Sequence, residues 1–589
     1  MSIASLLFRR SALLVAAISA VWLIALLWTG GFTLRLGAVT FRSHRPAGAL
    51  AVFGIAALIA FTAGGRLAVA ADLSRSWIAL DRAAAGVAAA AAIAAFSIAV
   101  HWGTFTAGGS DSYCYVSQAA LFADGRMAID QPLARELPWT GAAASLVPSG
   151  YVASPDPAVI VPKCPPGLAL LMAVALRIGG TNAVFYVVPL LGGLAVFLTF
   201  AIGRLVEQSV AGALAAVLLS VSPIFVFQIV QPMSDVPATA FWLLAIAFAL
   251  RRTAAAATIA GLAASAAILT RPNLAPLAGV MLLFRIPNAH FRIVPFLLGA
   301  LPGLVATLAL NAALHGSPFR SGYGDLGQLF AVGNTLSNIT HFARSLLETQ
   351  TPIVLVGLAA PFLAVRTAAP GKGPASVWWL FLMFITAVWA AYVGYQAFGE
   401  WWYVRFLLPA LPLMLLSSAV CIVYFVERLP PATRTPVLVI GVALLCGWTL
   451  RVADARLAFD LHRLERRYAV TGAFIARQLP PNAIVLAVHQ SGSVRHYSGR
   501  TTIAWDAIDP GELDAAVDAL ARRKREPYLL LETWEESVFR QRFRGRSRLG
   551  DLDWPPAAII GRDVRLYEIA ARTRYRLGRP VHPSRVPVP

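Results

Sequence analysis

The chain has 589 residues, of which 58% are hydrophobic and 13% are charged, whereas about a quarter of the residues in a soluble globular protein are charged. This composition excludes a soluble globular protein, and repeated apolar runs of about 17 to 23 residues indicate a polytopic membrane protein. The net charge of +20 does not indicate nucleic-acid binding, because the cations lie in short loops and in the C-terminal tail, without a recognisable nucleic-acid motif.

The apolar runs predict about thirteen transmembrane helices. Arg9 and Arg10 precede the first run, and most of the following alternate loops are basic, so the N-terminus is expected on the cytoplasmic side of the membrane. The basic 30–46 loop is the exception, because the count places it outside. The spans are expected near residues 11–29, 47–64, 84–101, 182–203, 210–230, 235–250, 254–270, 274–285, 293–312, 351–366, 376–398, 405–427 and 434–453.

This count places three segments on the outer side of the membrane: the loop at residues 102–163, the loop at 313–350, and the tail from Arg451 onward. The apolar stretch Pro165–Gly180 is not counted as a span, because its core would rise only about 17 Å as a helix, roughly half of a bilayer. We expect it to form a helix along the outer surface.

The tail is predicted to form a small outer α/β domain over residues 454–575, followed by a disordered, proline-rich end at 576–589. Helices are expected around Leu464–Gln478 and Leu513–Arg522. Short apolar runs with turn residues between them predict strands at Ala483–Val488, Thr501–Trp505, Tyr528–Leu531, Ala557–Ile560 and Val564–Ile569.

The first outer loop opens with a short polar helix, predicted from Asp111 to Ala123, with Ser110 as its cap and an end near Gly125. Asp111, Tyr115 and Gln118 follow one another at helical spacing and therefore share a face. Asp111 either only stabilises the start of the helix or acts in catalysis, and the helix itself does not decide between these roles.

Further charged residues lie at the outer edges of the predicted spans, although each has an ordinary structural explanation, such as a helix cap or a membrane anchor. A carboxylate can accept a proton from a hydroxyl group, and a cation can hold a departing phosphate. Because these carboxylates and cations are all predicted on the same side of the membrane, they suggest group transfer at a bilayer surface. These residues are Lys163, Asp235, Arg271, Glu400 and Arg405.

Cys114 and Cys164 share the first outer loop and could form a disulfide if their Cα atoms came within about 4.4–6.8 Å. Cys421 and Cys446 lie in predicted spans, where they are expected to be small apolar residues. The sequence shows no His, Asp and Glu cluster with the spacing of metal ligands, so no metal is expected, although a divalent ion is not excluded.

Four short motifs together resemble the GT-C superfamily of glycosyltransferases, in particular the bacterial enzymes that use polyprenyl-phosphate sugars. These enzymes include the protein O-mannosyltransferase and aminoarabinose-transferase groups. The resemblance covers roughly residues 84–453, and residues 1–83 would add two transmembrane helices. The motifs are Asp111 early in the first outer loop, Lys163-Cys164-Pro165-Pro166-Gly167, Ser234-Asp235-Val236-Pro237, and Arg405-Phe406-Leu407-Leu408-Pro409-Ala410.

The resemblance implies inverting transfer of a sugar from a polyprenyl-phosphate donor to a glycan, lipid or protein acceptor outside a bacterial inner membrane. It implies that Asp111 is the general base and that Lys163 and Arg405 bind the donor phosphate. Many relatives carry an acidic residue where this chain has Ser112, so metal assistance stays open. Substrate contacts are expected from Tyr115, Asp235, Arg271 and Glu400.

Two other classes of function remain. A transporter or lipid-linked glycan flippase would show charges at mid-membrane and two related halves, whereas here the charges lie at one face and the halves show no symmetry. A non-catalytic scaffold that presents the C-terminal domain is disfavoured only by the group of charged residues.

Overall fold

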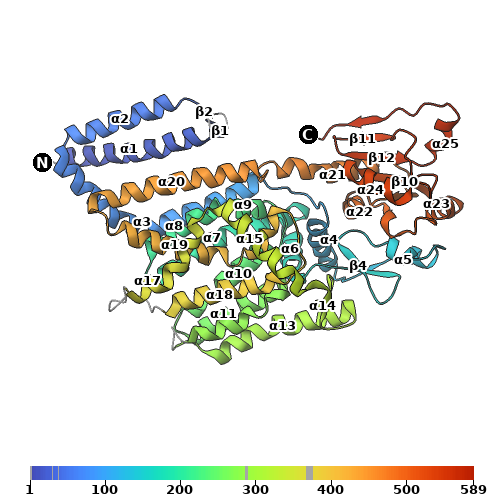
Figure 1. Ribbon diagram of the computed structural model, residues 1–589, viewed down its shortest axis with the longest axis horizontal. Helices are drawn as coiled ribbons and strands as arrows, with labels where there is room; N and C mark the ends of the chain where they lie inside the picture. The colour runs from blue at the N-terminus through green and yellow to red at the C-terminus, as the bar shows by residue number, and fades with distance from the viewer. Residues whose placement is uncertain (1–2, 30, 37–38, 286–289, 367–375, 589) are drawn as a thin grey trace.

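The computed structural model describes residues 3–29, 31–36, 39–285, 290–366 and 376–588 and is mostly helical (Figure 1). Most helices form one elongated body, and a unit with the largest sheet lies at one end of it. The molecule has the architecture of a multi-pass membrane protein. Lys372, which lies in the predicted loop between the spans at 351–366 and 376–398, is outside the described residues.

Six helices are each long and apolar enough to cross a membrane, counting only the residues that the structure describes. Three helix pairs pass the same test together but bend by more than 40°, and four shorter apolar helices accompany them. Every predicted span coincides with helical structure, although residues 274–285 form only short pieces, so the number thirteen stays a prediction. The main helices are α1 (Ile3–Thr29), α2 (Pro46–Thr62), α3 (Gly65–His101), α7 (Val187–Leu205), α8 (Ser209–Ser220), α9 (Pro223–Ile229), α10 (Asp235–Ala249), α11 (Ala254–Thr270), α12 (Leu277–Leu282), α13 (Ile293–His315), α15 (Thr335–Gln350), α18 (Ser376–Val393), α19 (Leu411–Val426) and α20 (Pro431–Ala455).

The N-terminal helices α1 and α2 form a hairpin that packs beside α20 (Figure 1). The chain then enters α3, a single helix of 37 residues. The domain boundary expected at residue 83 falls inside this helix. Asp72 does not interrupt it, because its carboxylate pairs with Arg9 of α1 at 2.7 Å, and both side chains are buried. The charged stretch predicted as a loop is therefore helical.

Helices α11 and α13 touch through glycines. A Cβ atom on Gly299 would lie 2.5 Å from the carbonyl oxygen of Thr258, and one on Gly303 would lie 2.3 Å from that of Ser265. Small residues at this spacing let membrane helices approach at backbone distance. The contact fixes α13 against α11, whose C-terminal end leads into Arg271.

The first outer loop contains α4 (Asp111–Ala123), α5 (Ala142–Ser145) and a three-stranded sheet in the order β3-β5-β4. Its strands are β3 (Ile129–Asp130), β4 (Tyr151–Ala153) and β5 (Val159–Pro162), and β5 ends immediately before Lys163. The stretch predicted as a surface helix forms α6 (Pro166–Gly179), which packs on α4 and leaves Val174 and Ile178 exposed.

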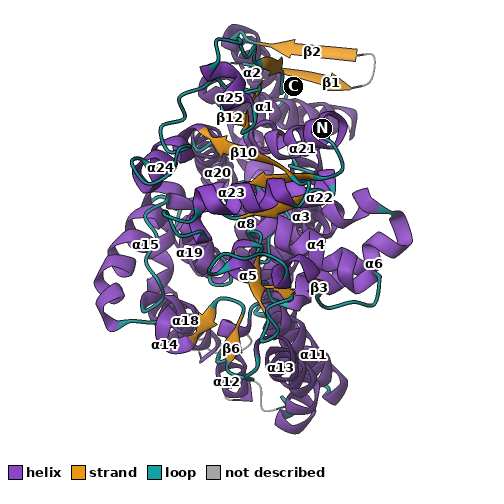
Figure 2. Cartoon of the chain, turned by 90° about the vertical axis from the view of Figure 1, so that its right-hand side faces the viewer, coloured by secondary structure: helices purple, strands orange, loops and turns teal. Residues whose placement is uncertain are grey.

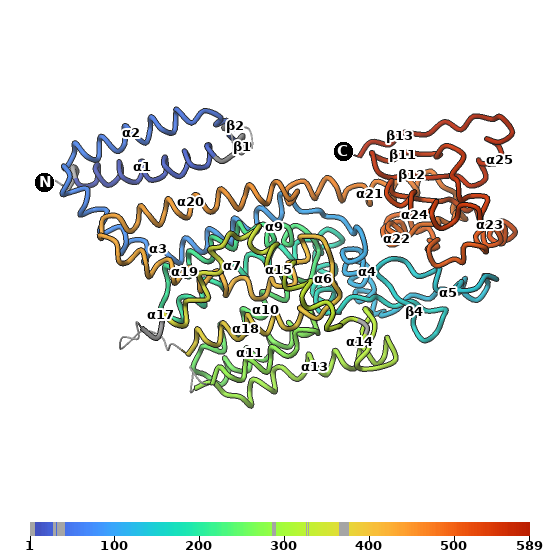
Figure 3. The backbone as a smooth tube through the Cα atoms, in the orientation of Figure 1, coloured from blue at the N-terminus to red at the C-terminus, as the bar shows by residue number. Residues whose placement is uncertain are grey.

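Residues 461–588, which we call the C-terminal unit, hold a six-stranded mixed sheet in the order β13-β11-β12-β10-β8-β9. Figure 3 shows β13, β11 and β12 next to one another in this unit. All five predicted strands are present, and helices occupy both predicted helical stretches. The elements are β8 (Ala483–Leu486), β9 (Thr501–Ile503), β10 (Glu526–Glu532), β11 (Ala558–Ile560), β12 (Val564–Glu568), β13 (Ser584–Val586), α21 (Leu461–Gln478), α22 (Ser491–Ser498), α23 (Leu513–Arg522), α24 (Thr533–Phe543) and α25 (Ala571–Arg576).

The expectation of disorder over residues 576–589 is wrong for most of this segment. Strand β13 pairs in parallel with β11, and Val586 and Val588 pack against the core of the C-terminal unit. Two valines between prolines supply enough apolar surface to hold an edge strand, and prolines are tolerated at such an edge.

The first outer loop and the C-terminal unit share one hydrophobic core. Leu137, Trp139 and Leu146 of the loop pack together with Leu486 and Trp505 of the C-terminal unit. Figure 2 shows this end of the molecule, with α5 and β3 next to the larger sheet. The two segments, more than 300 residues apart in the sequence, therefore fold as one body.

Candidate active site

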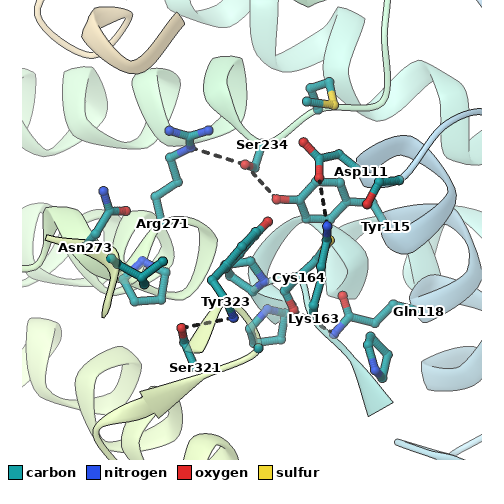
Figure 4. Close-up of a pocket in the computed structure, with 18 of the residues that line it drawn as sticks. Asp111, Tyr115, Gln118, Lys163, Cys164, Ser234, Arg271, Asn273, Ser321 and Tyr323 are labelled. Carbon is teal, nitrogen blue, oxygen red and sulfur yellow. Dashed lines mark hydrogen bonds and ion pairs between the residues drawn. The ribbon is translucent and has the colours of Figure 1, made fainter. Parts of the chain in front are cut away.

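A cavity of about 770 Å³ lies where the first outer loop, the helical body and the C-terminal unit meet. Its walls come from α4, the end of β5, the end of α11, α13, the turn between β6 (Arg320–Ser321) and β7 (Gly324–Asp325), η7 (Trp401–Leu407) and α21. Figure 4 shows part of this lining. The cavity thus joins segments from most of the chain.

Helix α4 begins and ends as predicted, and Asp111, Tyr115 and Gln118 all line the cavity. The Tyr115 hydroxyl donates a hydrogen bond to Oγ of Ser234 at 2.8 Å, and Nε2 of Gln118 donates one to the carbonyl oxygen of Cys164 at 3.2 Å. Ser110 is the N-cap residue, but the predicted side-chain cap is wrong, because Ser110 Oγ makes no hydrogen bond to any residue that the structure describes. The shared polar face of the helix is confirmed.

Two cations converge on Asp111. Nη2 of Arg405 lies 3.2 Å from Oδ2 of Asp111, and Nζ of Lys163 lies 3.9 Å from Oδ1. Burial raises the pKa of Asp111, but the positive charges of Arg405 and Lys163 outweigh burial and hold the pKa below its usual value of 3.8. Asp111 is therefore ionised at neutral pH, and its charge does more than stabilise the helix end.

Arg271 forms an ion pair and hydrogen bonds with other side chains of the protein. Its Nη2 lies 2.7 Å from Oδ1 of Asp235, its Nη1 donates to the hydroxyl of Tyr392 at 2.8 Å, and its Nε donates to Ser234 at 3.3 Å. The residue lies here because Pro272 disfavours helical geometry at the preceding position and ends α11 at Thr270. Figure 4 shows the hydrogen bonds that connect Arg271 through Ser234 to Tyr115.

Two of the residues predicted to contact the substrates do not line the cavity. The side chain of Asp235 is fully buried and forms an ion pair with Arg271. Glu400 is exposed and lies outside the lining, immediately before η7, where its carbonyl oxygen is 3.1 Å from Nε2 of His341. Of the predicted contacts, Tyr115 and Arg271 reach the cavity.

Cys114 and Cys164 are joined by a disulfide with a Cα–Cα distance of 6.2 Å, as the sequence allowed. Cys114 lies one turn after Asp111 on α4, and Cys164 directly follows Lys163. The bond therefore ties the carboxylate and its neighbouring cation into one covalent frame. Cys421 and Cys446 are free.

Replacing both Cys114 and Cys164 by Ala is expected to lower the free energy of unfolding by about 2–4 kcal/mol, because the bond closes a long loop in the unfolded chain. Thermal unfolding of the purified variant and of reduced wild-type protein should give the same loss. Non-reducing mass spectrometry that finds both thiols free in protein from an oxidising compartment would contradict the bond itself.

Several lining residues were not identified from the sequence. Tyr323 lies over Lys163, with Nζ 5.6 Å from the ring centroid, and the neighbouring Gly322 packs against the Lys163 backbone. An aromatic residue between two glycines in an outer loop is a signal that could have indicated it. Glu465 and Tyr468 of α21 gave no such signal, because only the tertiary fold brings them to the cavity.

No group of three or more His, Cys, Asp and Glu side chains is arranged to hold a metal ion within the described ranges of the chain. Asp111 is paired with Lys163 and Arg405, and Asp235 is paired with Arg271.

No family model matches the chain, and no curated protein sequence matches it. Among solved structures, ArnT from Cupriavidus metallidurans in the apo state is similar, with a TM-score of 0.52 at 12% identity over 84% of this chain and 98% of ArnT. ArnT bound to undecaprenyl phosphate gives a TM-score of 0.49 at 12% identity, over 79% and 94% of the two chains. The oligosaccharyltransferase of Archaeoglobus fulgidus, tethered to an acceptor peptide, gives 0.45 at 12% identity, over 79% and 72%. The chain therefore shares its overall fold with apo ArnT, in agreement with the fold that its motifs predicted.

Proposed function

We propose that this protein is a membrane glycosyltransferase that moves a sugar, with inversion, from a polyprenyl-phosphate donor to an acceptor outside a bacterial inner membrane. The observation that carries the proposal is the meeting of Asp111, Lys163 and Arg405 in one cavity at the edge of the helical body. A base and cations beside it are the groups that such a transfer needs. No resident cofactor is part of the proposal.

Lys163 is the cation best placed to take the donor phosphate. Its ammonium group is 3.9 Å from Asp111, a longer separation than the 2.7 Å between Arg271 and Asp235. Arg405 can assist, because its Nε is buried without a hydrogen-bond partner in the described structure. Such a donor favours an incoming anion, since an unsatisfied buried N–H group is costly.

The lipid part of the donor would lie against α13. This helix contributes mainly apolar side chains to the cavity, among them Leu304, which is 39% exposed. Neighbouring Leu301 and Val305 are also exposed, as expected for a helix that faces lipid. A polyprenyl chain could therefore reach the cavity from within the bilayer.

Asp111 would act as the base on the acceptor hydroxyl. The cations that lower the pKa of Asp111 are also those that attract the donor phosphate, so donor binding would draw their charge away and raise the basicity of the carboxylate. The acceptor oxygen then bonds to the sugar carbon as the bond from that carbon to the phosphate oxygen breaks. Asp111 takes the hydroxyl proton, and Lys163 and Arg405 stabilise the departing phosphate. Tyr115 and Arg271 would contact the substrates.

Replacing Lys163 by Met tests the assignment. The variant is expected to bind undecaprenyl phosphate roughly 10- to 100-fold more weakly, because a charge-assisted contact is lost. Its transfer rate should fall further, since the phosphate gains charge as the sugar leaves. The measurements are binding of undecaprenyl phosphate to purified protein and turnover of a polyprenyl-phosphate sugar.

The matched control is Lys524→Met, because Lys524 is exposed on the C-terminal unit and lies outside the cavity. This control should behave as wild type. Wild-type affinity in the Lys163→Met protein would remove the phosphate site, and absence of any transfer by wild-type protein with its native membranes as acceptor would count against the transferase function.

A further inference from the structure

The C-terminal unit contributes a carboxyl group to the wall of the cavity. Glu465 lies in the second turn of α21 and lines the same cavity as Asp111 and Lys163, together with Tyr468 one turn further along the helix. Helix α21 continues from α20 toward the sheet of the C-terminal unit (Figure 1). The roles proposed for Asp111, Lys163 and Arg405 leave this second carboxyl without a function.

The position of Glu465 is fixed by a close contact with the first outer loop. A Cβ atom on Gly108 would lie 2.3 Å from Oε2 of Glu465 and 2.4 Å from Cδ2 of Tyr468. A side chain at Gly108 would therefore displace the carboxylate of Glu465 and the ring of Tyr468. Because Gly108 lies just three residues before Asp111 in the sequence, the contact places Glu465 on the approach to the proposed base.

The carboxyl group of Glu465 has no hydrogen bond or ion pair among the residues that the structure describes, although charged groups lie near it. Arg467, on the same helix, is engaged by Glu532 of β10 at 3.1 Å. The hydroxyl of Tyr468 is bonded to Nε2 of His489 at 2.7 Å and also accepts from Arg467 at 3.0 Å. Tyr497 of α22 also faces this region, where its hydroxyl accepts from the backbone N–H of Ala107.

Burial raises the pKa of Glu465 to about 7, although the charge of Arg467 lowers it, and the charge of Glu532 adds to the increase. The group therefore changes its charge close to neutral pH. An ionised carboxylate accepts stronger hydrogen bonds than its protonated form.

We propose that Glu465 binds a hydroxyl group of the acceptor and holds the acceptor against α21 while the donor phosphate occupies the side of Lys163. The inference rests on the proposed transferase function and assigns one side of the cavity to each substrate. An ionised carboxylate repels a phosphate but accepts a hydrogen bond from a neutral hydroxyl, so the acceptor at this position is a hydroxyl-bearing molecule such as a glycan.

The test compares wild type with Glu465→Gln and Glu465→Ala. Membranes from native cells that lack the protein supply the acceptor, and radiolabelled sugar is delivered from a polyprenyl-phosphate donor. For wild type, the amount of membrane needed for half-maximal transfer should fall as the pH rises from about 6 to about 8, because Glu465 ionises in this range. Glu465→Ala should need roughly 10- to 100-fold more membrane at about pH 8.

Glu465→Gln keeps the shape and a weaker acceptor atom, so its half-maximal amount should lie between the other two and lose this pH dependence. All three proteins should bind undecaprenyl phosphate equally, which also shows that they are folded. The control Glu526→Gln changes an exposed carboxyl on β10 outside the cavity and should match wild type.

The inference would be overturned if both Glu465 variants needed the same amount of membrane as wild type for half-maximal transfer and kept the pH dependence of wild type. If Glu465→Ala does not fold, Glu465→Gln alone decides, through its pH profile. A wild-type protein that transfers no sugar under these conditions would instead refute the transferase function, so the two failures are distinguishable.

Discussion

Replacement of Asp111 by Asn is expected to lower turnover of a polyprenyl-phosphate sugar by roughly 10²- to 10⁴-fold, because the carboxamide has the same shape but cannot accept the acceptor proton. The same variant should bind undecaprenyl phosphate at least as tightly as wild type. Asp111 now pairs with Lys163 and Arg405, at 3.9 and 3.2 Å, and its charge competes with the phosphate for both cations. Loss of rate with retained or improved donor affinity is the signature of a base held between phosphate-binding groups.

The control for this experiment is Asp124→Asn, which removes an exposed carboxylate at the other end of α4, where it pairs with the exposed Arg126. Its turnover and affinity should equal those of wild type. Near-wild-type transfer by the Asp111→Asn protein would eliminate the base assignment, and weaker donor binding would show that Asp111 supports the phosphate site in another way.

Replacement of Asp235 by Asn is expected to destabilise the folded protein by about 3–5 kcal/mol, because it leaves Arg271 as a buried cation without its counter-charge. Both side chains are largely enclosed, with Asp235 fully buried and Arg271 12% exposed. Thermal unfolding of detergent-purified protein measures this effect without any substrate. A simple helix cap at Asp235 would cost much less, on the order of 1 kcal/mol.

The double variant Asp235→Asn with Arg271→Gln should recover part of the lost stability, since neither partner then carries a charge and the glutamine can still bond to Ser234 or Tyr392. Equal unfolding temperatures for wild type and Asp235→Asn would contradict a stabilising ion pair. In that case the direct substrate contact first predicted for Asp235 would need to be reconsidered.

Local patterns predicted the parts of the fold that depend on local physics. The length of apolar runs gives the positions of the spanning helices, and the polar residues at helical spacing in Asp111–Ala123 give a helix with its site-facing side. Residue alternation and turns give the strands from Ala483 to Ile569. The span count and the distribution of basic loops also predicted Lys163 and Arg405 on the same side of the membrane as Asp111.

The sequence could not supply features that depend on tertiary partners. Polar residues made Arg66–Arg82 resemble a loop, although the pairing of Asp72 with Arg9 permits a continuous helix. Prolines made the last residues resemble a disordered tail, although in the structure some of them form β13, which pairs with β11. The contact of Glu465 with Gly108 joins segments more than 350 residues apart in the chain, and neither segment carries a sign of the other.

The core shared by the first outer loop and the C-terminal unit also constrains how the protein is made. Synthesis proceeds from the N-terminus, so Leu137, Trp139 and Leu146 are produced long before the side chains that cover them, which come only with the last part of the chain. During this interval the loop exposes apolar surface that can be recognised by folding factors or cleaved by proteases. The cavity is thus completed last, because Glu465 and Tyr468 of its lining come with the C-terminal unit.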